Sequence, residues 1–194
     1  MTPSFDNLKL HIRRFTPITD QEFQSISPLF EILDTRKKEI LLHAGKICND
    51  HFFVLTGCLR MYFLSEKGTE HTVEFGLENW WLTDQMAYLN NATTSCYIQA
   101  VENSTILRLS KSAEDRLIHE YPAIKEYFLH IYQRGFAAAQ KRSMLFREYN
   151  REELYHHFSS NYPKFIQRVP QYLIASYLGF SAEYLSEIRK KNIS

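Results

Sequence analysis

The spacing of hydrophobic positions changes twice along the chain. Residues 17–33 show the three-and-four spacing of an amphipathic helix, with Phe23, Ile26 and Phe30 on one side. From about residue 39 to 110 short apolar runs separated by turn residues replace that spacing, and many short strands at regular intervals predict a sandwich or barrel. The expected strands are 40–43, 51–55, 58–64, 71–75, 80–83, 95–100 and 105–109. Helical spacing returns at Lys111 and dominates to the end, so the fold class is α+β.

The longest periodic segment follows Pro122. Apolar and small residues are spaced alternately by four and three there, which is a heptad seam on a helix of about 27 residues, roughly 40 Å long. We predict that this helix pairs with its copy in a homodimer, while Tyr132 and Phe136 beside the seam pack on the strands. A core helix packed only on the β-domain is the alternative. The predicted seam residues are Ile124, Phe128, Ile131, Gly135, Ala138, Arg142 and Leu145.

The last 25 residues predict a helix-turn-helix. Pro170 suits the first turn of a helix, Gly179 suits the left-handed position that ends it, and Ser181 can cap a second helix. Two short helices joined by a tight glycine turn place the second helix in the DNA major groove. A helical hairpin that merely closes a core is the alternative. The side chains expected at DNA are Gln171, Ser181, Ala182, Glu183, Ser186, Glu187, Arg189, Lys190 and Lys191.

The distribution of charge favours the DNA-binding interpretation. Residues 139–194 hold nine Lys/Arg and five Asp/Glu, whereas residues 1–138 hold fourteen and seventeen, so the balances are +4 and −3 and sum to the net +1. A basic end on a mildly acidic chain is what a phosphate-binding segment shows, although four charges make a weak field.

Composition narrows the class of protein. The 194 residues are 44% hydrophobic and 14% aromatic, as in a folded globular protein. No run of eighteen apolar residues and no apolar signal core occurs, so we expect a cytoplasmic protein with no membrane partner. The three cysteines, Cys48, Cys58 and Cys96, have no zinc-site or C-x-x-C spacing. We therefore expect buried thiols and no metal ligands.

The order of these parts resembles the cyclic-AMP receptor (Crp/Fnr) family of bacterial transcription regulators. Residues 42–45 (LHAG) and 52–60 (FFVLTGCLR) look like the two glycine turns of its β-roll, and residues 162–179 look like its short-tailed Bacteroidetes-type branch. The resemblance implies a cyclic-nucleotide-binding-like jelly roll, a long dimerisation helix and an all-α helix-turn-helix domain without a β-wing. We expect the domains at residues 1–121, 122–149 and 150–194.

The effector site departs from the family pattern. The family binds the ribose with a Gly-Glu pair and the cyclic phosphate with an Arg-Ser pair, and in our alignment Thr83-Asp84 and Thr94-Ser95 stand there. An uncharged Thr94 leaves a buried phosphate unpaired, at a cost of roughly 2–5 kcal/mol. We therefore expect no tight binding of cyclic AMP, and a small effector of unknown identity instead. The residues assigned to this pocket are Trp81, Thr83, Asp84, Thr94, Ser95, Tyr97 and Ala138.

The resemblance implies a DNA-binding regulator, not an enzyme, with duplex DNA, a second copy, RNA polymerase and an effector as partners. No cofactor is predicted: no cysteine precedes Cys48 to hold an iron–sulfur cluster, and no histidine stands out as a haem ligand. Glu187 replaces the family's usual arginine on the recognition helix. Two alternatives stay open: an effector-binding or scaffolding β-roll that has lost DNA binding, and a cupin-like metal enzyme built on His71 and Glu74.

Overall fold

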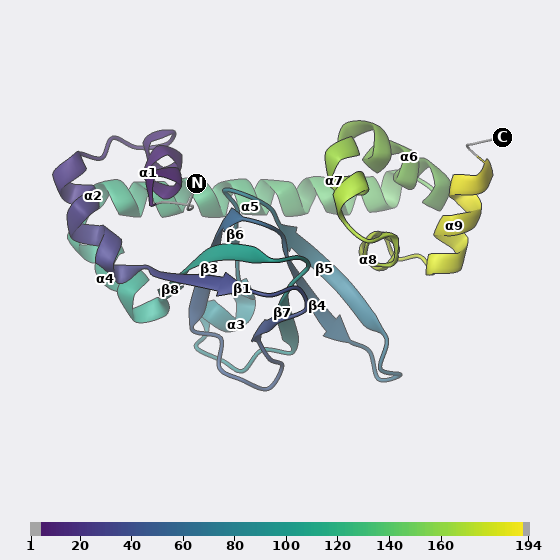
Figure 1. Cartoon of the computed structure of the whole chain (residues 1–194), viewed down its shortest axis with the longest axis horizontal. Coiled ribbons are helices and arrows are strands. Elements are labelled where there is room, and N and C mark those ends of the chain that lie inside the picture. Colours follow the sequence, from purple (N-terminus) through teal and green to yellow (C-terminus); the bar gives the residue numbers. More distant parts are fainter. Residues whose placement is uncertain (1–4, 192–194) are drawn as a thin grey trace. The chain divides into compact units, whose positions relative to one another are not determined.

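The computed structural model describes residues 5–191, which form two compact units. One unit comprises residues 5–63 and 74–134, and the other comprises residues 64–73 and 135–191. Figure 1 labels the helices and strands of both. No helix of the described residues is both long enough and apolar enough to span a bilayer.

The first unit contains two four-stranded sheets, with strand orders β1-β8-β3-β6 and β2-β7-β4-β5, as in a double-sheet roll. Its register is antiparallel, for example Val54 opposite Ile106 and Tyr62 opposite Tyr97. The strands are β1 (Glu31–Thr35), β2 (Ile40–Leu42), β3 (Asp50–Thr56), β4 (Leu59–Leu64), β5 (Glu70–Gly76), β6 (Trp81–Leu82), β7 (Cys96–Ala100) and β8 (Ser104–Ser110). The predicted α+β class with a β-roll is confirmed.

The N-terminal third departs from prediction in two places. The helix predicted over residues 17–33 is shorter: α2 (Asp20–Ile26) starts at a capping box on Thr19 and passes into a 3₁₀ turn that contains Pro28. Residues 31–35 are strand β1, because they pair along the whole edge of β8. Helix α1 (Asp6–Arg13) was not anticipated, and neither was the short α3 (Gln85–Leu89).

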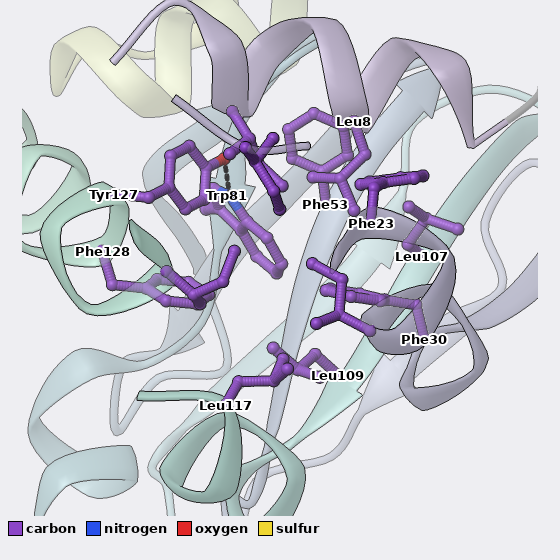
Figure 2. Packing of buried hydrophobic residues seen from close by; sticks show 14 of the residues in the cluster. Leu8, Phe23, Phe30, Phe53, Trp81, Leu107, Leu109, Leu117, Tyr127 and Phe128 are labelled. Carbon is purple, nitrogen blue, oxygen red and sulfur yellow. Dashed lines mark hydrogen bonds between the residues drawn. The ribbon is translucent and has the colours of Figure 1, made fainter. Parts of the chain in front are cut away.

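One large core lies between the β1-β8-β3-β6 sheet and the helices, as Figure 2 shows. Phe53, Trp81 and Leu107 point from the strands into this cluster, and the indole N–H of Trp81 donates to the Tyr127 hydroxyl at 2.8 Å. Strand β3 is buried on both faces, because its alternate side chains point away from the helices into the roll. The helices that complete the cluster are α1, α2, α4 (Lys111–Glu120) and the first half of α5 (Pro122–Glu148).

A polar cluster is buried beside this core. The Glu114 carboxylate of α4 lies 3.0 Å from His51 Nδ1 of β3, and it accepts from the hydroxyls of Tyr88 in α3, at 3.0 Å, and Tyr132 in α5. Only about 2% of the Glu114 surface is exposed. The cluster therefore joins four elements of the first unit through one carboxylate.

The second unit holds the C-terminal helices. They are α6 (Arg151–Asn161), α7 (Pro163–Arg168), α8 (Gln171–Leu178) and α9 (Ala182–Lys191). The predicted break after Tyr149 is confirmed, since α5 ends at Glu148 and Asn150 and Glu153 form the expected capping box. The predicted start of the long helix at Pro122 is confirmed as well.

Candidate functional site

Helices α8 and α9 and the turn between them stand where we predicted the helix-turn-helix. Gly179 ends α8 with a φ of +76°, a conformation that glycine adopts without strain, and the Phe180 N–H donates to the Ala175 carbonyl at 2.8 Å across the turn. The Ser181 hydroxyl accepts from the Tyr184 N–H at 3.1 Å and so caps α9 as predicted. Leu185 and Ile188 are buried against α8, which leaves the opposite face of α9 to solvent.

The structure exposes most of the side chains that we expected at DNA. The exposed ones on α9 and its cap are Ser181, Ala182, Glu183, Ser186, Glu187, Arg189, Lys190 and Lys191. Gln171, at the first position of α8, is half-buried, and its amide donates to the Ile166 carbonyl at 3.1 Å. Gln171 also lines a notch of about 280 Å³ together with Ala182, Leu185, Ser186, Arg189 and Lys190. The notch brings the N-terminal end of α8 and the exposed face of α9 together.

The charges of α9 are segregated along the helix. Glu183 lies in the first turn, and the three cations Arg189, Lys190 and Lys191 lie in the last turn, which suits the helix dipole. Hydrogen bonds from its own backbone N–H and from Ser181 lower the pKa of Glu183 below its usual range. The Glu183 carboxylate is therefore ionised at neutral pH.

Asp84 and Thr94, at the positions that we aligned with the family's nucleotide-binding residues, form a hydrogen bond with each other. Asp84 caps α3 by accepting from the Ala87 N–H at 3.3 Å, and its second oxygen accepts from the Thr94 hydroxyl at 2.6 Å. The Thr94 oxygen in turn accepts from the Cys96 N–H at 2.9 Å. Burial raises the pKa of the Cys96 thiol, and likewise that of nearby Cys48, so both stay protonated. The Asp84 carboxylate thus has a partner on each oxygen, and neither of these partners is a cation.

Several residues that we assigned to the effector pocket have other surroundings in the structure. Trp81 belongs to the core beneath the helices, 5.2 Å from Phe53 between ring centroids, because strand alternation turns it away from the roll. Ser95 is exposed. Tyr97 stacks on Tyr62 across the β4–β7 pair, on the face opposite to buried Ile98.

Two more pocket assignments have a different environment from the one expected. Thr83 is buried beside Asp84, and its hydroxyl donates to the Asp50 carbonyl at 2.8 Å and contacts Cys48 Sγ at 3.2 Å. Ala138 lies in the other unit, where its side chain is exposed. The residues that the structure brings together at the pocket are therefore Thr83, Asp84 and Thr94, joined by Cys48 and Cys96.

The first residues of the predicted dimer seam on α5 lie in the core of the first unit. Ile124 and Phe128 are each about 1% exposed and belong to the core, and Ile131 packs against it. These residues are occupied because this stripe covers the strands, so they are not free to meet a second helix. Gly135 and Ala138 are exposed, and Leu145 is half-buried.

Apolar side chains on another stripe of α5 are exposed instead. Leu129, Phe136 and Met144 are 55%, 66% and 66% exposed, although Phe136 was expected to pack on the strands. Leu129 also lines a shallow apolar depression of about 380 Å³ between α4 and α5. Tyr132 of the same depression binds Glu114, so its expected packing on the β-roll unit holds.

One set of hydrogen bonds within the second unit was not predicted, because no sequence pattern indicates it. The Ser176 hydroxyl of α8 donates to the Glu70 carbonyl and accepts from the Thr72 N–H, both at 2.9 Å. Arg142, predicted as a seam residue, donates from Nη1 to the Val73 carbonyl at 2.8 Å. Side chains of α8 and α5 thus satisfy backbone groups of the β5 strand, as a neighbouring strand would.

Comparison with known proteins agrees with this architecture. A family model described as "Cyclic nucleotide-binding domain" matches residues 33–121. The "Anaerobic regulatory protein" of Haemophilus influenzae is 21% identical over 185 residues, covering 88% of this chain and 70% of the relative.

Solved structures share the fold. FixK2 from Bradyrhizobium japonicum has a TM-score of 0.69 at 14% identity, covering 84% of this chain and 83% of FixK2. A CooA variant from Carboxydothermus hydrogenoformans has a TM-score of 0.66 at 19% identity, covering 89% of this chain and 80% of CooA. The comparisons thus show a cyclic nucleotide-binding domain at residues 33–121 and a fold that this chain shares with FixK2 and CooA.

Proposed function

We propose that this chain is a homodimeric transcription regulator that binds duplex DNA through α9 and is controlled by a small effector other than cyclic AMP. The observation that carries the DNA-binding proposal is the open face of α9. That face has small or polar side chains in its first two turns and three cations in its last, beside the N-terminal end of α8. A helix of this kind fits the major groove and neutralises phosphates at its edge.

The salt dependence of DNA binding tests this proposal. Binding of a random-sequence duplex, followed by fluorescence anisotropy, should weaken as salt rises, because bound cations release counterions from the duplex. Replacing Arg189 and Lys191 by glutamine should lower the slope of log K against log salt by about two. Replacing the exposed Arg36 and Lys37 of the first unit in the same way should leave the slope unchanged. Equal slopes for all three proteins would refute the role of α9.

The internal bond between Asp84 and Thr94 supports the effector part of the proposal. A cyclic phosphate at this position would have to break a 2.6 Å hydrogen bond and would gain no cation in return. Calorimetry with cyclic AMP and cyclic GMP should therefore show no binding at micromolar concentrations, and micromolar binding of either would contradict the proposal. The double variant Asp84→Glu and Thr94→Arg restores the residue types that the family uses for the ribose and the phosphate. It is the matched variant that should gain binding of a cyclic nucleotide.

The exposed stripe of α5 supports the homodimer. Leu129 and Phe136 are seven residues apart, which is the spacing of a helix–helix seam, and both are solvent-exposed in the single chain. Exposed apolar side chains of this size in a row mark an interaction surface. Sedimentation equilibrium of the purified chain should give twice the monomer mass. The identity of the effector, the contact with RNA polymerase and the absence of a β-wing stay predictions.

A further inference from the structure

The edge of strand β5 is held by side chains from two helices of the second unit. The Ser176 hydroxyl of α8 donates to the Glu70 carbonyl and accepts from the Thr72 N–H, both at 2.9 Å. Arg142 of α5 donates from Nη1 to the Val73 carbonyl at 2.8 Å. An edge strand presents unpaired N–H and C=O groups, and here helical side chains bind them in place of a strand. We term these three hydrogen bonds the strand clamp.

The residues of the strand clamp also join α8 to α5. The Arg142 guanidinium lies over the ring of Tyr177, 5.8 Å from the ring centroid, as in a cation–π pair. Tyr177 directly follows Ser176 on α8, so two neighbouring side chains of this helix contact β5 and α5. Along the chain, α5 and α8 are separated by α6 and α7. These contacts therefore link the long helix directly to the first helix of the predicted helix-turn-helix.

The position of α8 determines the position of α9. The tight turn at Gly179 joins the two helices, and Leu185 and Ile188 of α9 are buried against α8. The residues of the strand clamp lie on α8, α5 and β5, and the polar face of α9 stays exposed. The strand clamp therefore orients α9 relative to the C-terminal half of α5, and it leaves open the face of α9 that we expect at DNA.

We propose that Ser176 and Arg142 are positioning residues for DNA binding. The strand clamp that they form fixes the angle between α9 and α5, and this angle sets the spacing of the two half-sites that a dimer binds. The inference rests on the proposed function, in which α5 pairs with its copy and α9 contacts DNA. Two base pairs inserted between half-sites turn the second half-site by about 70° and shift it by about 7 Å. A dimer with fixed recognition helices does not follow that change, whereas a dimer without the strand clamp follows it in part.

The dependence of DNA binding on half-site spacing tests this proposal. The probe is a duplex that the unmodified protein selects from a random library, compared with versions in which two base pairs are inserted or removed between the half-sites. The unmodified protein should bind both altered duplexes at least about tenfold more weakly. Ser176→Ala, which removes two hydrogen bonds and introduces a good helix former, should reduce this penalty severalfold. Ser176→Ala combined with Arg142→Met should nearly abolish the penalty, and Ser160→Ala, an exposed serine of α6, is the matched control that should keep it.

A second measurement shows whether the strand clamp itself has opened. Hydrogen exchange of the Thr72 amide, which donates to the Ser176 hydroxyl, should be faster in Ser176→Ala and unchanged in Ser160→Ala. A double variant that binds every duplex more weakly by the same factor, or that keeps the full spacing penalty, would overturn the inference while the DNA-binding proposal stands. A protein that selects no duplex at all would refute the proposed function, and this inference with it.

Discussion

Replacing Glu114 by glutamine should destabilise the chain strongly for a single isosteric change. The carboxylate is almost fully buried and faces three donors, His51 Nδ1 and the hydroxyls of Tyr88 and Tyr132. Burial first, and then the neighbouring Glu114 charge, raise the pKa of both tyrosines, so their hydroxyls remain protonated and able to donate. A glutamine amide keeps one acceptor oxygen, but in place of the second oxygen its NH₂ group, a donor, would face the donors around it.

The magnitude follows from the cost of leaving buried partners unsatisfied. Hydrogen bonds to a charged group contribute about 1.5–3 kcal/mol, and removing one member of a buried charged pair costs about 3–5 kcal/mol. Because the tyrosine hydroxyls can rotate to accept, we expect about 3 kcal/mol for Glu114→Gln. For a chain of this size that loss lowers the melting temperature by about 6–12 °C.

The free energy of unfolding in urea at pH 7 measures this effect, with the protein concentration held constant because a dimer unfolds in a concentration-dependent way. Glu120→Gln is the matched control on α4: Glu120 is exposed and has only a 3.6 Å ion pair with Arg116 one turn away, so its loss should cost less than about 0.5 kcal/mol. Equal losses for the two variants would refute the assigned role of the cluster.

Acid gives an independent readout of the same cluster. Burial opposes ionisation of Glu114, but the His51, Tyr132 and Tyr88 contacts outweigh it and hold the pKa below the ordinary 4.5. A carboxyl with a lowered folded-state pKa stabilises the fold above its unfolded pKa, and this contribution disappears as pH falls through the folded pKa. The difference between the unmodified protein and Glu114→Gln should therefore shrink below about pH 4.5.

Three further changes test other parts of the structure. Gly179→Ala should lower the free energy of unfolding in urea by about 1 kcal/mol, because Gly179 has a positive φ. Gly135→Ala, inside α5 with open space around it, should raise the free energy of unfolding by about 0.5–1 kcal/mol. Equal effects of the two variants would refute the conformational argument. Phe136→Glu should convert the proposed dimer to a monomer in sedimentation, and Lys141→Glu, exposed on another side of α5, should not. Burial, together with the charges of Arg14 and Arg134, lowers the pKa of His11 to about 4. The free energy of unfolding should therefore fall as pH decreases from 6.5 to 4, and His11→Gln should lessen that fall.

Local signals predicted the helical part of the chain well. Pro122, Asn150, Pro170, Gly179 and Ser181 each act on the backbone within one or two turns, so the helix limits that they predicted are those observed. The strand region was found because its turns and apolar runs alternate regularly. Strand β1 was missed because its apolar residues continue the spacing of α2, and only pairing with β8 decides its state.

Assigning a face to α5 required information that the sequence does not contain. A helix that covers a sheet and also meets a second helix has two apolar stripes, and periodicity finds both without ranking them. Ile124 and Phe128 fit the heptad seam as well as Leu129 and Phe136 do, yet only the first pair is buried in the single chain. The polar cluster around Glu114 was not predicted for a similar reason. His51 and Glu114 are 63 residues apart, and no local sequence pattern links them.

The Asp84–Thr94 pair bears on the proposal that this domain binds an effector other than cyclic AMP. One oxygen of Asp84 caps α3, and this hydrogen bond supports the helix whether or not a ligand binds. The other oxygen is the one a ribose would meet, and here the Thr94 hydroxyl takes it. We expect the side chain ten positions after Asp84 to decide whether an anion binds here, and in this chain it is the uncharged Thr94. An uncharged side chain there leaves the cap of α3 intact and offers no charge to pair with a phosphate, which is why we propose that the domain keeps its fold and binds a different effector.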